Sequence, residues 1–332
     1  MNSTSDPVLP SHPYKDRKTG LVIFGIMTAL MGLVCALFIP LMLFGQAMAA
    51  KAGTPQNAQA IIPAILIYGM LAVAFVWLGV GSMMARRWAR ALLLIFSWSW
   101  LIIGVFTTVV LVFVLPQIME AVSAQPGQPE MPAAAKPLMV VISMLLMGII
   151  YILLPTAWVL FYRSSHVKAT CEAYDPVVRW TDRCPLPVLA VSLWLAFSAP
   201  MILMTAVVFK GVLPVFGSFV VGPAGSALCI LLALLWGYSA WAFYRLDQRG
   251  WWIIVVSMIL FSVSAFITYS KHDVMEIYSL MGFPEDQMAQ IQKFNFFKGP
   301  AMAWASVCGM IPILGYLIYV RRYFALPNQS DS

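Results

Sequence analysis

The chain has 332 residues, of which 61% are apolar and 10% charged, and its mean hydropathy is +0.86. Soluble domains are close to half apolar and a quarter charged, so this composition excludes an ordinary soluble domain. The net charge of +7 would suit a nucleic-acid-binding surface. The basic residues instead lie between long apolar runs, and we therefore expect no nucleic-acid partner.

The apolar residues fall into eight long runs, which predict an all-α, polytopic membrane protein with eight transmembrane helices. Each run is long enough to cross a hydrocarbon core of roughly 30 Å as a helix. The runs occupy residues 21–45, 61–84, 91–115, 138–162, 187–209, 221–244, 251–270 and 299–320. Charged side chains lie between or at the ends of the runs, where they avoid an insertion cost of roughly 2.5–3.5 kcal/mol for a central Arg or Lys.

The basic residues are divided unequally between the two sides of the predicted bundle. With eight spans, both termini share one side, and that side carries Lys15, Arg17, Lys18, Arg86, Arg87, Arg90, Arg163, Lys168, Arg179, Arg183, Arg245, Arg249, Arg321 and Arg322. The other side carries Lys51, Lys136, Lys210, Lys271, Lys293 and Lys298. The positive-inside rule then predicts cytoplasmic N- and C-termini in a plasma membrane, which in a bacterium is the inner membrane.

The two halves of the sequence repeat proline and polar residues in the same order. The segments ALFIPLML and AFSAPMIL, in the first and fifth runs, carry Ala and Pro at the same spacing. We predict two parallel four-helix pseudo-repeats, because an even number of spans gives both copies the same orientation. The predicted organisation is an N-terminal tail (1–20), a first half (21–162), a cytoplasmic linker (163–186), a second half (187–320) and a C-terminal tail (321–332).

A short helical hairpin outside the membrane is predicted in each half. Apolar residues spaced three and four apart follow the third run from Leu115 and the seventh run from Val274, as in an amphipathic helix. Gly127 and Gly282 fit the left-handed residue that ends such a helix. Proline two residues later fits the first turn of the next helix.

The same outer segments hold carboxylates and a histidine that could form a cation site. This outer carboxylate cluster comprises Glu120, Glu130, His272, Asp273, Glu276 and Glu285. His272 and Glu276 are four residues apart and share a helix face. Helix capping and solvation explain the same spacing and are favoured, because the cluster has no established metal-binding motif. We therefore predict no metal and no cofactor.

A second candidate site is a belt of arginines beside tryptophans at the cytoplasmic ends of the runs. The belt comprises Arg86, Arg87, Arg90, Arg245 and Arg249. A guanidinium binds phosphate through paired N–H groups, so the belt could hold lipid phosphate. Simple anchoring at the membrane interface explains the same pattern and is the favoured interpretation.

The cytoplasmic linker reads HVKATCEAYDPVVRWTDRCP from His166. Its Asp175-Pro176 pair predicts the start of a short helix, because proline is tolerated in the first turn. We expect Arg179, Asp182 and Arg183 to form ion pairs that dock the two halves.

The sequence contains no nucleophile–base pair, phosphate loop or zinc-binding helix motif. Our leading hypothesis is a non-enzymatic scaffold that binds lipid or another membrane protein. The alternative is a transporter or channel for a neutral or lipophilic solute between the halves, lined by hydroxyl residues such as Ser97, Thr107, Ser262 and Ser264. A third hypothesis is a lipid-modifying enzyme that uses Glu120 and Glu276.

Overall fold

The computed structural model describes residues 14–51, 58–123, 135–283, 285, 288–289, 292 and 299–324. Within these residues, eight helices are long and apolar enough to cross a membrane, which is consistent with the predicted all-α membrane protein. Single helices form six of the spans: α1 (Lys18–Lys51), α2 (Ala58–Met83), α3 (Arg87–Ser123), α7 (Leu186–Val208), α8 (Pro223–Tyr244) and α9 (Gln248–Tyr269).

The fourth and eighth spans are each interrupted just before a proline. The fourth consists of α4 (Ala135–Gly148), the π-helix η1 (Ile149–Leu153) and α5 (Leu154–Arg163), and the eighth of α12 (Gly299–Cys308), α13 (Met310–Arg321) and η3 (Arg322–Phe324). Pro155 and Pro312 lie shortly after the interruptions. Proline has no N–H for the carbonyl four residues earlier, so each of these prolines removes one helix hydrogen bond beside an interruption, although α1, α2 and α7 continue through Pro40, Pro63 and Pro200.

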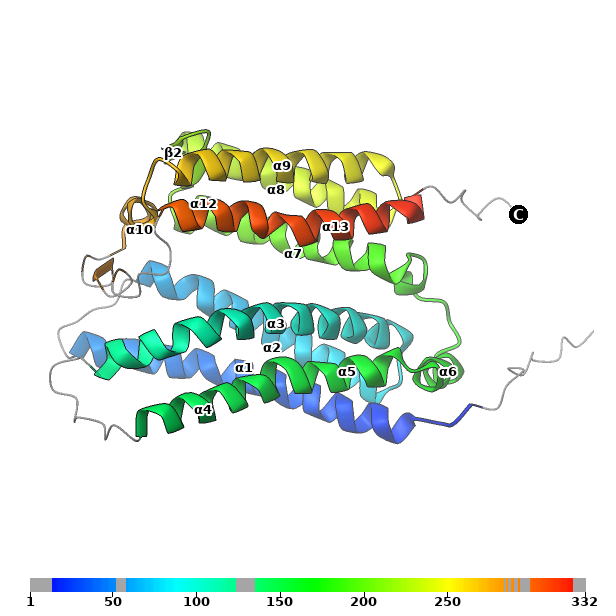
Figure 1. Ribbon diagram of the computed structural model, residues 1–332. Helices are drawn as coiled ribbons and strands as arrows, with labels where there is room; N and C mark the ends of the chain where they lie inside the picture. The colour runs from blue at the N-terminus through cyan, green and yellow to red at the C-terminus, as the bar shows by residue number, and fades with distance from the viewer. Residues whose placement is uncertain are drawn as a thin grey trace, which may run out of the picture.

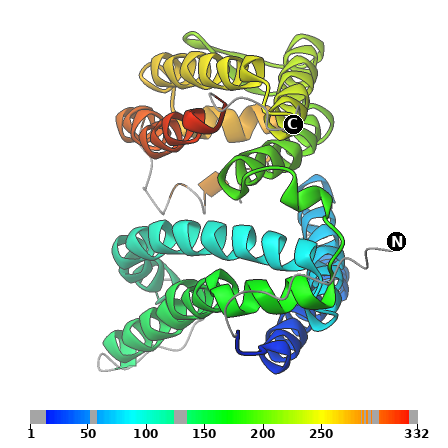
Figure 2. The ribbon, with the colours of Figure 1, turned by 90° about the vertical axis from the view of Figure 1, so that its right-hand side faces the viewer.

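The helices form two groups, with α1–α5 in one and α7–α13 in the other (Figure 1, Figure 2). The short helices α6 (Ser165–Tyr174) and η2 (Trp180–Asp182) lie in the linker between them. Both chain ends leave the bundle on the side of α6 (Figure 1). We call this side the basic end, and the other the outer end.

Each group has a hydrophobic core, and both cores are concentrated at the basic end. The first contains Leu21, Leu78, Ala85, Leu93, Leu94, Trp158, Tyr162, Val167 and Cys171. The second contains Cys184, Val188, Leu189, Val191, Leu195, Ala240, Phe243, Trp251, Ile254, Leu317 and Val320. The helices are therefore held most firmly where the linker and the chain ends meet.

Glycine lets α1 and α2 pack backbone against backbone. A Cβ atom added to Gly79 would lie 2.6 Å from the carbonyl oxygen of Gly25, and one added to Gly32 would lie 2.9 Å from that of Ala72. Small residues at such crossings allow close van der Waals packing, which is the main attraction between helices in a lipid solvent.

The outer end differs between the two groups, and one expectation is wrong here. The stripe that begins at Leu115 continues α3, which is unbroken to Ser123. By contrast, α9 ends at Tyr269 and a separate helix, α10 (Val274–Met281), follows. A hairpin that the sequence analysis did not expect, β1 (Leu213–Val215) with β2 (Ser218–Val220), joins α7 to α8. Its two-residue turn is Phe216-Gly217, where both residues have positive φ, the backbone twist that suits tight hairpins.

The predicted cap at the end of α10 is confirmed. Gly282 has φ +84°, in the left-handed region that suits glycine. The corresponding residues of the first half, Gly127 and Pro129, lie outside the described residues, as does Pro284. The pseudo-repeat itself stays a prediction.

Replacing Gly79 by Ala should destabilise the protein by about 1–3 kcal/mol, because the new methyl group overlaps the backbone of α1. Gly237→Ala in α8 is the matched control, since nothing lies within 4 Å of its added Cβ. Removing the backbone freedom of that glycine should leave stability unchanged or raised by a few tenths of a kcal/mol. Thermal unfolding in a mild detergent would measure both, and equal midpoints for the two variants would contradict the close-packing role of Gly79.

Candidate functional site at the basic end

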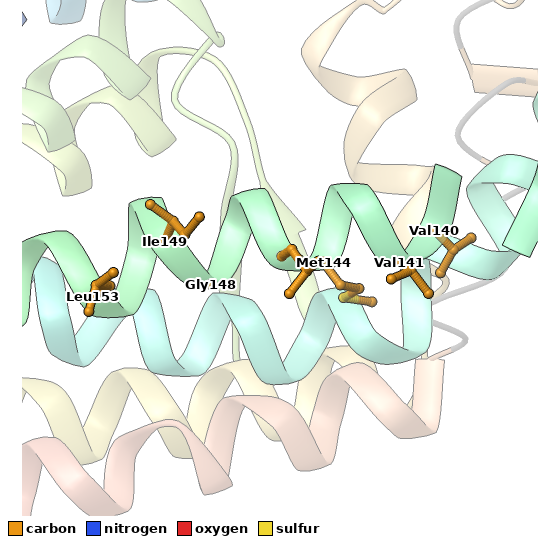
Figure 3. A pocket seen from close by; sticks show the side chains of 7 residues that line it. Val140, Val141, Met144, Gly148, Ile149 and Leu153 are labelled. Carbon is orange, nitrogen blue, oxygen red and sulfur yellow. The ribbon is translucent and has the colours of Figure 1, made fainter. Parts of the chain in front are cut away.

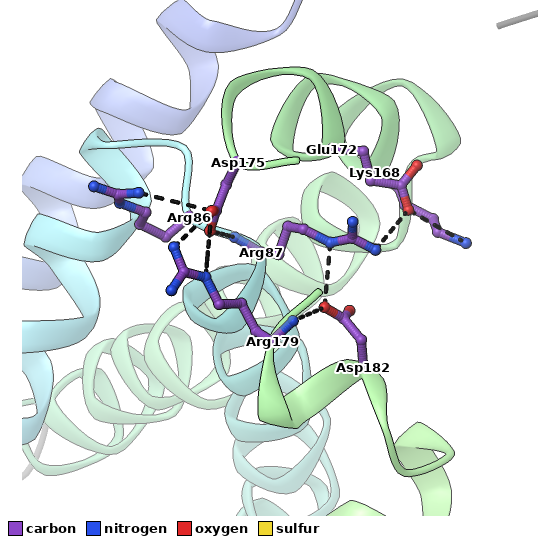
Figure 4. A network of polar contacts seen from close by, with 7 residues as sticks. All are labelled: Arg86, Arg87, Lys168, Glu172, Asp175, Arg179 and Asp182. Atoms are coloured by element: carbon purple, nitrogen blue, oxygen red, sulfur yellow. Dashed lines mark hydrogen bonds and ion pairs between the residues drawn. The ribbon is translucent and has the colours of Figure 1, made fainter. Parts of the chain in front are cut away.

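The best-defined polar site is a set of charged side chains where the linker packs against the α2–α3 turn. Its members, drawn in Figure 4, are Arg86, Arg87, Lys168, Glu172, Asp175, Arg179 and Asp182. We call this set the linker clamp. The α2–α3 turn supplies two arginines, and the linker supplies the remaining five residues.

Asp175 is the centre of the clamp, and its side chain is only 2% exposed. The guanidinium of Arg179 donates to this carboxylate through Nε at 3.1 Å and Nη2 at 2.7 Å. Arg86 lies 3.7 Å away, and the backbone N–H of Arg87 donates to the second carboxylate oxygen at 3.4 Å. A carboxylate this deeply buried needs such partners, because removing a charge from water is costly.

The hydrogen bond from Arg179 holds the pKa of Asp175 below its ordinary value, and the N–H of Arg87 and the charge of Arg86 act in the same direction. A carboxyl group with a lowered folded-state pKa contributes stability above the ordinary carboxyl pKa. That contribution is lost as pH falls through the folded-state value. The contribution of Asp175 to the clamp is therefore present at neutral pH and is lost only at pH values below the ordinary carboxyl pKa.

Arg87 joins the two remaining carboxylates. Its guanidinium lies 3.5 Å from Glu172 and 3.2 Å from Asp182, and Lys168 also reaches Glu172 at 3.9 Å. Asp182 accepts a hydrogen bond from the backbone N–H of Arg179 at 2.9 Å, which caps η2. One arginine from the start of α3 thus connects α6 to η2.

The clamp changes two expectations about the linker. Asp175-Pro176 does not start a helix: Asp175 follows the last residue of α6 and its backbone N–H bonds to Cys171. The helical stretch precedes this pair because the apolar side of α6, including Val167 and Cys171, belongs to the first core. Arg179 and Asp182 do form ion pairs, but with the linker itself and the first half.

The N-terminal segment also packs against α6. The backbone N–H groups of Lys15 and Arg17 donate to His166 Nδ1 at 3.3 Å and Thr170 Oγ1 at 3.1 Å. The ammonium of Lys18 lies 4.2 Å from the ring centre of Tyr174. The linker helix is therefore held between the chain start and the α2–α3 turn.

Contacts to the second half come from hydrogen bonds and apolar packing. Trp194 Nε1 donates to Ser99 Oγ at 2.8 Å, and the hydroxyl of Tyr244 donates to the carbonyl of Trp180 at 3.1 Å. Ile95 of α3 packs on the second core, and Leu186 packs on the first. The two groups of helices are thus joined near the clamp.

The predicted arginine belt is divided by the structure. Arg86 and Arg87 are engaged by carboxylates of the clamp. Arg90 has a buried Nε that lacks a hydrogen-bond partner among the described residues. Arg245 lies 5.3 Å from the ring centre of Trp241, and Arg249 is exposed at the start of α9.

The outer carboxylate cluster is brought together only in part. Nδ1 of His272 lies 2.8 Å from Glu276, and Asp273 caps α10 by accepting from the N–H of Met275. Glu285 is helical and exposed, whereas the side chain of Glu120 and the whole of Glu130 lie outside the described residues. No group of three metal-ligating side chains occurs in the described part of the chain.

His272 also joins α10 to the β-hairpin. Its Nε2 lies 3.1 Å from the carbonyl oxygen of Gly217, while the N–H groups of Phe216 and Gly217 donate to Ser264 at 2.8 Å and Thr268 at 2.9 Å. Both partners of the imidazole are acceptors, so both bonds form together only when both ring nitrogens carry protons. The hydrogen bond to Glu276, followed by that to Gly217, raises the pKa of His272 above its ordinary value, and the charge of Lys271 opposes this.

The span hydroxyls proposed to line a solute path mostly bond to backbone. Ser97, Ser262 and Ser264 are all at least 93% buried and donate to the carbonyls of Leu93, Ser306 and Pro214. Thr107 is half-buried.

No family model matches this chain, and no curated protein or solved structure shows significant similarity to it. The class of protein is therefore described from the structure alone: it is largely α-helical, with eight helices of membrane-spanning length among its described residues.

Asp175→Asn should loosen the linker clamp and expose the thiol of Cys171, which is 1% exposed and whose burial raises its pKa to about 12. Hydrogen bonds to charged groups contribute about 1.5–3 kcal/mol. We therefore expect maleimide labelling of Cys171 to accelerate at least tenfold, as measured by peptide mass spectrometry. Glu172→Gln is the control and should change the rate little, because Glu172 is 39% exposed and exposed pairs contribute about 0–1 kcal/mol. Equal rates in all three proteins would show that the carboxylate of Asp175 does not hold the linker.

His272 should titrate above the ordinary histidine value of about 6.5. Its stabilising contribution to the hairpin is then fully present below that value and is lost as pH rises through the higher folded-state pKa. NMR of ¹⁵N-labelled histidine should show both ring nitrogens protonated at pH values where an ordinary histidine is neutral. Glu276→Gln should shift the midpoint downwards, and an unchanged midpoint in that variant would contradict the proposed bond.

Proposed function

We propose that this chain is a non-enzymatic, multi-pass scaffold of the plasma membrane that binds another membrane protein. The proposed orientation places the basic end and both termini in the cytoplasm, following the excess of Lys and Arg on that side. In a bacterium this membrane is the inner membrane. Two parallel four-span units, the first and second groups of helices, complete the proposed organisation.

The observation that carries the proposal is the uncovered face of the fourth span. In the most apolar 18-residue stretch of Pro137–Arg163, none of the residues is buried, compared with 33% in each of Leu186–Val208, Pro223–Tyr244 and Gln248–Tyr269. Leu138, Leu145 and Leu153 are each about 60% exposed. The fourth span therefore has much of its surface available for a neighbour.

The surface of the fourth span also has a shallow depression. A shallow apolar groove runs along α4 and η1 and is lined by Val140, Val141, Met144, Leu145, Gly148, Ile149 and Leu153 (Figure 3). Among the described residues outside its own helix backbone and chain neighbours, none has a heavy atom within 4 Å of a Cβ added to Gly148, so a neighbouring helix could approach the backbone there. Short π-helical turns are frequently found at functional positions in helices.

The linker clamp supports a scaffold role because it sets the positions of the helices at the basic end. The cores, the N-terminal segment and α6 are all connected there, while α4 extends away from them (Figure 1). Helices fixed at the basic end, together with an exposed apolar α4, suit a protein that presents a surface to a partner.

Transport of a neutral or lipophilic solute is the second candidate function. It is favoured by the interruptions of the fourth and eighth spans at η1 and Gly309, because transporters form binding sites at discontinuous helices. Tyr151 and Thr156 provide polar groups near the first interruption. The buried, backbone-bonded serines provide less support for this function than for helix packing.

A photoreactive amino acid at Leu145, on the groove, tests the scaffold function in native membranes. We expect a single crosslinked protein, either one partner or a second copy, identified by mass spectrometry. The control places the same group at Leu234 of α8, which is 66% exposed but lies outside the groove, and should yield lipid adducts only. Lipid adducts alone at both positions would oppose the scaffold and leave transport as the better hypothesis.

A further inference from the structure

Arginines at the basic end have different partners in the two groups of helices. In the first group, the guanidiniums of Arg86 and Arg87 face carboxylates. In the second group, the guanidiniums at the end of the eighth span lie on aromatic rings. Arg321 lies 5.0 Å from the ring centre of Trp251 and 5.6 Å from that of Trp252.

Arg322 is held by the neighbouring tyrosines. Its guanidinium carbon lies 4.0 Å from the ring centre of Tyr319 and 4.9 Å from that of Tyr323, and Nη2 donates to the hydroxyls of both tyrosines, at 2.5 Å and 3.0 Å. Both Arg321 and Arg322 are exposed. A guanidinium held beside aromatic rings keeps N–H groups for an acceptor: Nε and Nη1 of Arg322, and the N–H groups of Arg321.

One of these rings, that of Trp251, is fixed by the second core. Trp251 is 4% exposed and its Nε1 donates to the carbonyl of Leu317 at 2.8 Å. This bond joins the start of α9 to the end of α13, so the position of Arg321 depends on the packing of the second core. The side chains are thereby preorganised for a ligand that carries negative charge.

Carboxylate partners are missing from this corner within the described residues. No Asp or Glu oxygen in that part of the chain lies within 4.0 Å of the guanidinium nitrogens of Arg321 or Arg322. Asp247, the acidic residue just before α9, accepts a hydrogen bond from the backbone N–H of Arg249 and so caps the helix. Within the described residues, Arg86 and Arg87 of the first group are therefore paired with carboxylates, whereas Arg321 and Arg322 of the second are not.

We propose that Arg321 and Arg322, held by Trp251, Trp252, Tyr319 and Tyr323, bind the phosphate of an anionic lipid headgroup. A planar guanidinium matches two phosphate oxygens, and two adjacent guanidiniums complement the charge. A lipid is favoured over free phosphate because exposed apolar groups lie beside the arginines. Trp252 is 49% exposed and Ile318, one helical turn before Arg322, is 65% exposed, so both are available to an acyl chain.

The proposed lipid site uses Arg321 and Arg322, neither of which belongs to the arginine belt predicted from the sequence. It depends on insertion of the protein in a membrane, as the proposed function does, but not on a partner at the α4 groove. Loss of crosslinking at Leu145 would therefore leave the lipid site unaffected.

The test is native mass spectrometry of the full chain in detergent with phosphatidylglycerol or phosphatidylcholine added. We expect the wild-type protein to retain phosphatidylglycerol preferentially, and R321Q/R322Q to lose affinity for it by about tenfold or more. The matched control, R163Q/R183Q, removes the same charge from exposed arginines at the same end and should keep the preference. Size-exclusion profiles would establish that each variant is folded.

R321K/R322K separates a specific site from general attraction. Lysine keeps the charge but not the planar pair of donors, so this variant should also lose most of the preference. Full retention by the lysine variant, or an equal loss in the R163Q/R183Q control, would overturn the proposal in favour of general surface charge. Displacement of the lipid by excess inorganic phosphate at constant ionic strength would overturn its assignment to a lipid headgroup.

Discussion

The arrangement at the basic end depends on one buried carboxylate. Asp175 lies at the end of α6, is almost fully buried, and has Arg179 on one side and the α2–α3 turn on the other. A buried ion group is stable only where its partners are held in position, so the carboxylate and its arginines constrain one another. This mutual constraint fixes the linker, and the linker in turn connects the two hydrophobic cores through Leu186 and Trp180.

Away from this end, the long apolar helices suit an environment without water. Backbone groups in a membrane must find partners within the protein, which favours uninterrupted helices. Where proline removes a donor, as at Pro155 and Pro312, the helix changes its pairing instead of continuing unchanged. Where glycine removes a side chain, as at Gly25 and Gly79, two helices approach each other closely. These local substitutions shape a chain that has few charged groups with which to build specific contacts.

Arginines near tryptophans make different contacts in the two groups of helices. Arginines close to tryptophans mark the basic end of both groups, but only the linker supplies Glu172, Asp175 and Asp182, and these acids contact the first group. The second group satisfies its guanidiniums on aromatic rings and keeps their charge. The three carboxylates of the linker therefore give the arginines of the α2–α3 turn a structural role.

The sequence by itself determined the fold class, the eight helices of membrane-spanning length, the excess of basic residues on one side and the glycine that ends α10. Each of these follows from local composition or from the backbone preference of a single residue. Only the tertiary structure decided which arginine meets which acid, that Asp175 ends a helix, that α3 is unbroken, and that a hairpin lies beside His272. Ion pairs such as Arg86–Asp175 join residues 89 positions apart, and sequence spacing carries no information about such pairs. The helix ends before Asp175, instead of starting there, because Val167 and Cys171 of α6 pack on the first core.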